Sequence, residues 1–125
     1  MNYDENAKYI EKIGLLAFDS SKILNMSHLF EKWNSLIPIN LSDFDYSSVI
    51  DMSYMFSECS FESIDLSNLN TPKVENISHI FEGCSSLKET NLTNFNNAEI
   101  KDISYMFSKC SSITSIDLSI LNIYQ

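Results

Sequence analysis

Apolar residues along the chain follow two spacings that take turns. Met52, Met55 and Phe56 have the i, i+3, i+4 spacing of one helical turn with a single apolar face. The segment 61–66 reads Phe-x-x-Ile-x-Leu and ends in the apolar–polar alternation of a strand. Both patterns recur along the chain. The sequence therefore predicts short strands and short helical turns in regular succession.

The two patterns belong to one internal repeat. Its phenylalanines are 26, 25 and 26 residues apart, with a serine three residues before each one. The slot three residues after holds tryptophan once and cysteine three times. The residues that define the repeat core are Phe30, Phe56, Phe81, Phe107, Cys59, Cys84 and Cys110, with Trp33 in the cysteine slot of the first unit. We assign residues 1–22 to an N-terminal cap with a half repeat, and residues 23–125 to four repeats in a single domain.

A period of 25–26 residues indicates a stacked architecture. It falls within the ~20–29 residues of leucine-rich repeats. One unit cannot bury its apolar face alone, whereas stacked units cover each other. We expect an α/β solenoid: a right-handed coil with a short-stranded parallel sheet on one face and short helical turns on the other. Its five strands would begin with residues 10–15.

Charge and composition exclude some classes of binding partner. The 125 residues carry a net charge of -9, with lysine but no arginine. This disfavours nucleic acid and anionic membrane surfaces, which are bound largely through basic side chains. No apolar stretch approaches the ~20 residues of a membrane span. Residues 1–18 lack a signal peptide, so we expect a cytoplasmic location if the chain is complete.

The repeat resembles the BspA-like leucine-rich-repeat family, which includes the repeat of mycoplasma-type surface lipoproteins. The resemblance is carried by Asp-Met-Ser-Tyr-Met-Phe-Ser-Glu-Cys at 51–59, by Cys-Ser-Ser-Ile at 110–113 and by Ile-Asp-Leu-Ser at 116–119. It covers roughly residues 10–125. It implies a surface protein that binds host or matrix proteins, with no catalytic site in its repeats. The chain departs from that family in lacking a signal peptide and a lipoprotein cysteine near its start.

Candidate chemical groups are better explained by the repeat. Cys59, Cys84 and Cys110 share one slot and form no CxxC pair, which favours buried free thiols over a metal site or a disulfide. His28 and His79 alternate with tyrosines at one repeat position, which indicates a surface position more than a catalytic imidazole. Asp65 and Asp117 belong to different repeats with Asn91 between them, so a paired-acid mechanism is disfavoured. We predict no catalytic residue, no metal and no cofactor.

These observations favour a non-catalytic protein–protein interaction module. The polar strand face is the candidate binding surface, for a protein partner whose identity the sequence does not give. Its candidate residues are Asn40, Asp43, Glu62, Asp65, Asn68, Glu89, Asn91 and Asp117. The alternative is a structural or self-associating part of a longer repeat array. In that case the apolar residues of the last coil, around Leu118, would associate with a further coil.

Overall fold

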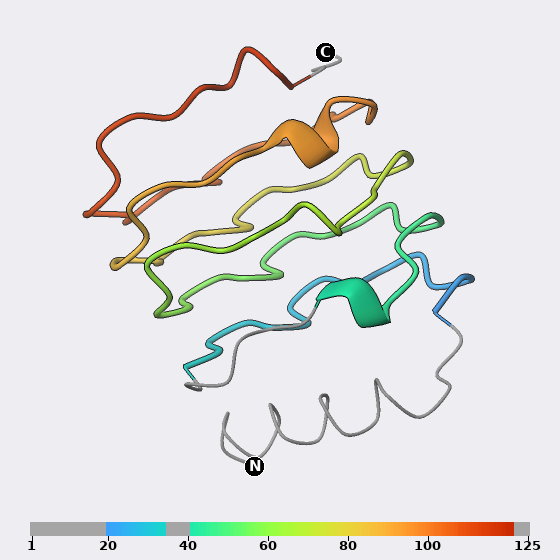
Figure 1. Cartoon of the computed structure of the whole chain (residues 1–125), viewed down its shortest axis with the longest axis horizontal. Helices are drawn as coiled ribbons and strands as arrows, with labels where there is room; N and C mark the ends of the chain where they lie inside the picture. Colours follow the sequence, from blue (N-terminus) through green and yellow to red (C-terminus); the bar gives the residue numbers. More distant parts are fainter. Residues whose placement is uncertain (1–19, 35–40, 122–125) are drawn as a thin grey trace.

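The computed structural model describes residues 20–34 and 41–121. Within them the chain winds in successive layers, each lying on the one before, from the blue to the red end of Figure 1. Two single turns of 3-10 helix are the helices of these residues: η1, Leu41–Asp43, and η2, Thr93–Phe95. The layers, which we call coils, repeat at the period of the sequence.

Rows of backbone hydrogen bonds join each coil to the next. The amides of Met26 and His28 donate to the carbonyls of Asp51 and Ser53, at 2.9 and 3.0 Å. The same four-bond row recurs between the second and third coils and between the third and fourth. Isolated parallel bridges mark these rows: Asn25 with Asp51, Asp51 with Asn76, and Asn76 with Asp102. Within these rows each coil donates to its successor, and just before each row two amides donate back, as those of Ile50 and Asp51 do to the Leu24 carbonyl.

The helical turns expected around residues 52–56 are wrong. The Met55 amide donates to the Met52 carbonyl at 3.2 Å, but the Tyr54 and Phe56 amides donate to the next coil. A helix needs successive amides to bond within one segment, whereas here every second amide leaves the coil. Tyr54 and Glu58 also have positive φ angles of 59° and 57°. The apolar spacing is that of a repeated turn, which buries one side as a helical turn would.

The expected parallel sheet is also wrong, because the described residues contain no strand. Between segments 61–66 and 87–92, one backbone hydrogen bond is present, from the Lys88 amide to the Glu62 carbonyl at 2.9 Å. Side chains accept hydrogen bonds from amides that a sheet would pair between strands. The Ser67 amide, for example, donates to the Asp65 carboxylate at 2.9 Å. Such local bonds compete with sheet pairing. The strand expected at 10–15 and most of the one at 36–41 lie outside the described residues.

The α/β solenoid with helical turns and a parallel sheet is therefore not the architecture of this chain. Both elements were inferred from apolar spacing, which reports which side chains are buried. In this fold the buried residues sit on turns and irregular segments, and the backbone ladder joins turn to turn.

The core runs through the stack as a column of aromatic rings. Phe30, Phe56, Phe81 and Phe107 stack in sequence with centroid separations of 5.8, 5.7 and 5.5 Å. The first three are almost fully buried, and Phe107 packs against the core while partly buried. Each ring covers its neighbour, so one phenylalanine per coil sets both the spacing of the layers and their alignment.

Candidate functional site

The segments expected as strands form a polar face whose backbone is shaped by Asx turns. In three coils an aspartate or asparagine side chain accepts a hydrogen bond from the amide two residues ahead. The pairs are Asp65 with Ser67, Asn91 with Thr93, and Asp117 with Ser119, at 2.9, 3.0 and 2.9 Å. All six residues are exposed. The turns give the face a fixed backbone shape that recurs from coil to coil.

Hydrogen bonds from the serines stabilise the charged form of the acids on this face. The Ser67 side chain and amide lower the pKa of the Asp65 carboxyl below its usual value. Ser119 does the same for the pKa of Asp117. Both carboxylates are therefore ionised throughout the neutral range, and the face is acidic.

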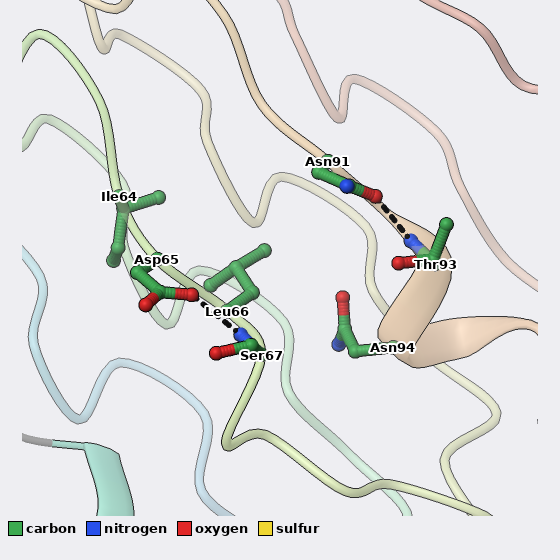
Figure 2. Close-up of a pocket in the computed structure, with 7 residues that line it drawn as sticks. All are labelled: Ile64, Asp65, Leu66, Ser67, Asn91, Thr93 and Asn94. Atoms are coloured by element: carbon green, nitrogen blue, oxygen red, sulfur yellow. Dashed lines mark hydrogen bonds between the residues drawn. The ribbon is translucent and has the colours of Figure 1, made fainter.

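A small depression lies between two neighbouring coils on this face (Figure 2). It is lined by residues 64–67 of one coil and by Asn91, Thr93 and Asn94 of the next, and its volume is about 80 Å³. Ligand pockets usually measure ~300–1,000 Å³, so this depression is too small for a typical substrate. It has room for one side chain or a few atoms of a larger partner.

Asn94 is the unusual residue of the depression. Neither its amide nitrogen nor its carbonyl oxygen has a hydrogen-bond partner, although both atoms are buried. Leaving a buried polar group without a partner costs about 1–3 kcal/mol. Figure 2 shows the Asn94 side chain near Thr93, among the residues that line the depression. The Asn94 amide therefore has no hydrogen-bond partner within the described part of the chain.

The predicted binding residues fall into three groups. Asp65 and Asn91 line the depression. Glu62, Asn68, Glu89 and Asp117 are exposed, and Glu62 pairs with Lys88 at 3.4 Å. Asp43 lies in η1, and Asn40 lies outside the described residues. The structure thus brings Asp65 and Asn91 together and adds Asn94. The sequence prediction omitted Asn94, although Asp43 and Asn68, at the same position of other repeats, were among its residues.

A second ordered surface is formed by the alternating histidines and tyrosines. His28, Tyr54, His79 and Tyr105 stack face to face, with centroids 4.6, 4.3 and 4.9 Å apart and interplanar angles of 7°, 7° and 14°. Their backbones all have positive φ, between 57° and 64°. Sequence analysis expected surface positions here but did not predict a ring ladder. The regular alternation of His and Tyr was the signal that could have indicated it.

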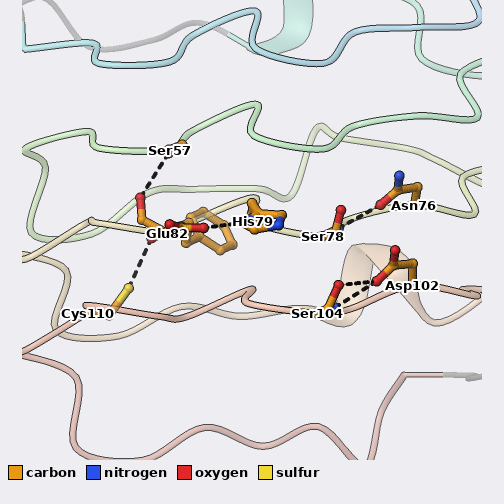
Figure 3. A network of polar contacts seen from close by, with 9 residues as sticks. Ser57, Asn76, Ser78, His79, Glu82, Asp102, Ser104 and Cys110 are labelled. Atoms are coloured by element: carbon orange, nitrogen blue, oxygen red, sulfur yellow. Dashed lines mark hydrogen bonds and ion pairs between the residues drawn. The ribbon is translucent and has the colours of Figure 1, made fainter.

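Glutamates accompany the histidines of the ring ladder. The Glu31 carboxylate is 2.6 Å from His28 Nδ1, and Glu82 contacts Nδ1 of His79 in the same way. Figure 3 shows His79 and Glu82 together, with the Asn76–Ser78 and Asp102–Ser104 turns beside them. The imidazoles are therefore positioned by both neighbouring rings and carboxylates.

The cysteines form a buried row that is separate from these surfaces. Each thiol donates to the carbonyl of the repeat phenylalanine in the preceding coil: Cys59 to Phe30, Cys84 to Phe56, and Cys110 to Phe81, at 3.1, 3.0 and 3.0 Å. All three thiols are free. Burial raises their pKa values, that of Cys84 to about 12. The cysteines are therefore protonated hydrogen-bond donors within the core.

Groups that could do chemistry do not converge among residues 20–34 and 41–121. No cluster of three or more His, Cys, Asp or Glu side chains there could hold a metal ion. No helix in these residues is long and apolar enough to cross a membrane. What the chain offers instead is two regular surfaces: the acidic turn face with its depression, and the ring ladder.

These features define a repeat protein built from stacked coils with ordered polar surfaces. Residues 2–119 match the model of a family described as a mycoplasma protein of unknown function, DUF285. The chain belongs to this family. No curated protein and no solved structure matches it.

Proposed function

We propose that the chain is a non-catalytic protein-binding module whose contact surface is the acidic turn face around the depression. One observation carries this proposal: the buried amide of Asn94 is held without a partner beside an exposed polar rim. Native proteins leave few such groups unpaired, and each needs an explanation. Both atoms are closed to solvent, so the Asn94 side chain would first turn toward the depression. A peptide group of a bound protein would then supply both the donor and the acceptor that Asn94 lacks.

The shape of the face favours a protein over a small ligand. The depression is small, and the same Asx turn recurs at the equivalent position of three coils. A repeated surface suits an extended partner that contacts several coils, so that weak contacts add up. The ionised Asp65 and Asp117 favour a partner with a basic or hydrogen-bond-donating surface.

The sequence resemblance to BspA-like repeat proteins supports the same function. Members of that family bind host or matrix proteins and have no catalytic site in their repeats. We therefore propose a binding role for this chain.

A photo-crosslinking experiment tests the proposed face. A benzophenone amino acid replaces Ser67, at the rim of the depression, in the full chain. The matched control carries it at the exposed Lys73, which does not line the depression. In extracts of the native organism, we expect a discrete protein adduct from position 67 alone, suppressed by excess unmodified chain. Equal labelling from both positions, or none, would contradict the proposal.

Competition with variants tests the role of Asn94 itself. Asn94→Ala should compete at least tenfold less well for the adduct, while its free energy of unfolding stays level or rises, because two unpaired buried atoms are removed. The control is Thr71→Val, which also removes a buried hydroxyl that has no partner, outside the depression. It should be equally stable and compete fully. Loss of stability in Asn94→Ala would assign Asn94 a structural role instead.

A further inference from the structure

The backbone ladder gives the stack two different ends. In each of the first three coils, four alternate amides donate to the next coil. In the third coil they belong to Ile77, His79, Phe81 and Gly83, which donate to Asp102, Ser104, Met106 and Ser108 at 2.8–3.1 Å. Along these four positions the donors face the C-terminal end of the stack, whereas the amides just before each row, such as those of Lys101 and Asp102, donate back to the preceding coil.

The fourth coil has the same row of amide donors, but this row has no acceptors among the described residues. The equivalent amides are those of Ile103, Tyr105, Phe107 and Lys109, and no carbonyl among the described residues accepts a hydrogen bond from any of them. We call these four residues the donor edge. At the same end the Tyr105 side chain is 65% exposed, and its ring covers His79 with one face only. A row of unpaired backbone groups is a template for pairing with another chain.

The donor edge cannot pair with itself. Its odd-numbered carbonyls are used within the coil, since Ile103, Tyr105 and Phe107 accept from Met106, Ser108 and Cys110. Two such edges brought together would face donor with donor. The partner must therefore present a row of alternate backbone carbonyls, as the second, third and fourth coils do toward the coil before them.

The side chains show which kind of coil fits. The coils alternate between two types, one with Asn, His and Glu at three-residue intervals and one with Asp, Tyr and Ser. The first type occurs at 25–31 and 76–82, and the second at 51–57 and 102–108. The fourth coil is of the second type, so the pattern continues with a coil of the first type. The chain's own first described coil, 25–31, is of that type.

We propose that the donor edge binds the first described coil of a second copy of this chain, giving a head-to-tail assembly. Carbonyls at positions 25, 27, 29 and 31 would accept from the four edge amides. The second copy's His28 would stack on Tyr105, and its Phe30 on Phe107, as His28 stacks on Tyr54 and Phe30 on Phe56 within one chain. Its Asn25 would lie beside Asp102 as Asn76 does, which keeps two carboxylates from meeting.

This inference stands apart from the proposed function, because the donor edge and the depression share no residue. One pair in the assembly is unfavourable: Lys109 would lie beside Lys32 of the second copy. Within the chain the corresponding neighbours are Lys32 and Glu58, which form an ion pair at 3.5 Å. This mismatch provides a variant that should strengthen the assembly.

Sedimentation velocity of the full chain, across a hundredfold range of concentration, tests the proposal. A head-to-tail contact leaves a free donor edge on every assembly, so species should grow from dimer to trimer and beyond as concentration rises. A chain that stays monomeric, or that stops at a symmetric dimer, would overturn it.

Two variants locate the contact. Lys109→Glu places an acid beside Lys32 of the next copy and should tighten association about two- to fivefold in low salt, the range of exposed ion pairs. Lys73→Glu makes the same charge change away from the edge and should give no such gain.

Tyr105→Asn keeps a residue that accepts positive φ but removes the ring. It should weaken association at least tenfold with an unchanged circular dichroism spectrum. Equal effects of the two glutamates, or unaltered association of Tyr105→Asn, would place the contact elsewhere.

Discussion

The imidazole of His79 lies flat against the phenol of Tyr54, with 4.3 Å between ring centroids and 7° between their planes. Tyr105 covers the opposite face of the imidazole at 4.9 Å. The His79 side chain consequently remains only 21% exposed, although it belongs to a surface row. The ring ladder is therefore a packing element outside the phenylalanine core, and it joins the same coils a second time.

Replacing His79 tests how much the ring ladder stabilises the fold. His79→Asn suits the positive φ of this position but removes two ring contacts and the Glu82 pair. Aromatic pairs contribute about 0.5–1.5 kcal/mol each, so unfolding in urea should show a loss of roughly 1–3 kcal/mol. His28→Asn is the control, because His28 has one ring neighbour among the described residues. It should lose about half as much, and equal losses would argue against stacking as the cause.

The stability of the fold should be most sensitive to substitutions in the middle of the phenylalanine column. Phe81 is fully buried between Phe56 and Phe107. Phe81→Ala should lower the free energy of unfolding by about 3–5 kcal/mol, as is typical of a buried phenylalanine. Phe107→Ala, at the partly buried end of the column, should cost clearly less. A loss below about 1 kcal/mol for Phe81→Ala would contradict its role in the core.

Cys84 should be chemically inert in the folded chain. Burial raises the pKa of its thiol from 9.0 to about 12, so almost no thiolate exists at pH 8. Because the thiolate is the nucleophile, iodoacetamide should modify the folded chain much more slowly than the urea-unfolded chain. Rapid labelling of Cys84 under native conditions would show that the coil opens locally.

The raised pKa of Cys84 also predicts that the fold loses stability at alkaline pH. A pKa that is higher in the folded state contributes stability that is complete below the unfolded value of 9.0 and is lost as pH rises toward the folded value of about 12. Denaturation curves should therefore show stability falling between pH 9 and 12. Cys84→Ala should be less stable at neutral pH but should fall less steeply across this window. Parallel curves for the two proteins would assign the alkaline loss to other groups.

Gly83 occupies one of the positions with positive φ among the described residues. Its φ is 77°, and a Cβ there would lie 2.9 Å from Cγ of Glu58. Gly83→Ala should destabilise the chain by about 1–2 kcal/mol, because alanine disfavours positive φ and the Glu58 side chain must move. In a Glu58→Ala background the clash disappears and only the backbone cost remains. Thermal unfolding of the four proteins separates the two contributions, and an unchanged cost in that background would exclude the clash.

The sequence by itself determined the repeat and much of its packing. The 25–26 residue period, one phenylalanine per coil and one cysteine slot follow from the order of residues, because side chains in equivalent coils must occupy equivalent places. The polar face around Asp65 and Asn91 was predictable for the same reason. A period identifies which residues are neighbours across coils, and this holds whatever the backbone does between them.

Only the tertiary structure decided how the backbone satisfies its hydrogen bonds. The spacing of Met52, Met55 and Phe56 fits a helical turn and an open turn equally well, since both bury the same side. The choice depends on whether alternate amides find carbonyls in the next coil, as those of Tyr54 and Phe56 do. Likewise, the strand pattern at 61–66 could not show that the Asp65 carboxylate would accept a hydrogen bond from the Ser67 amide. Contacts between coils and local side-chain bonds outweighed intrinsic preference, and they also created the unpaired amide of Asn94 and the directional edge at Tyr105.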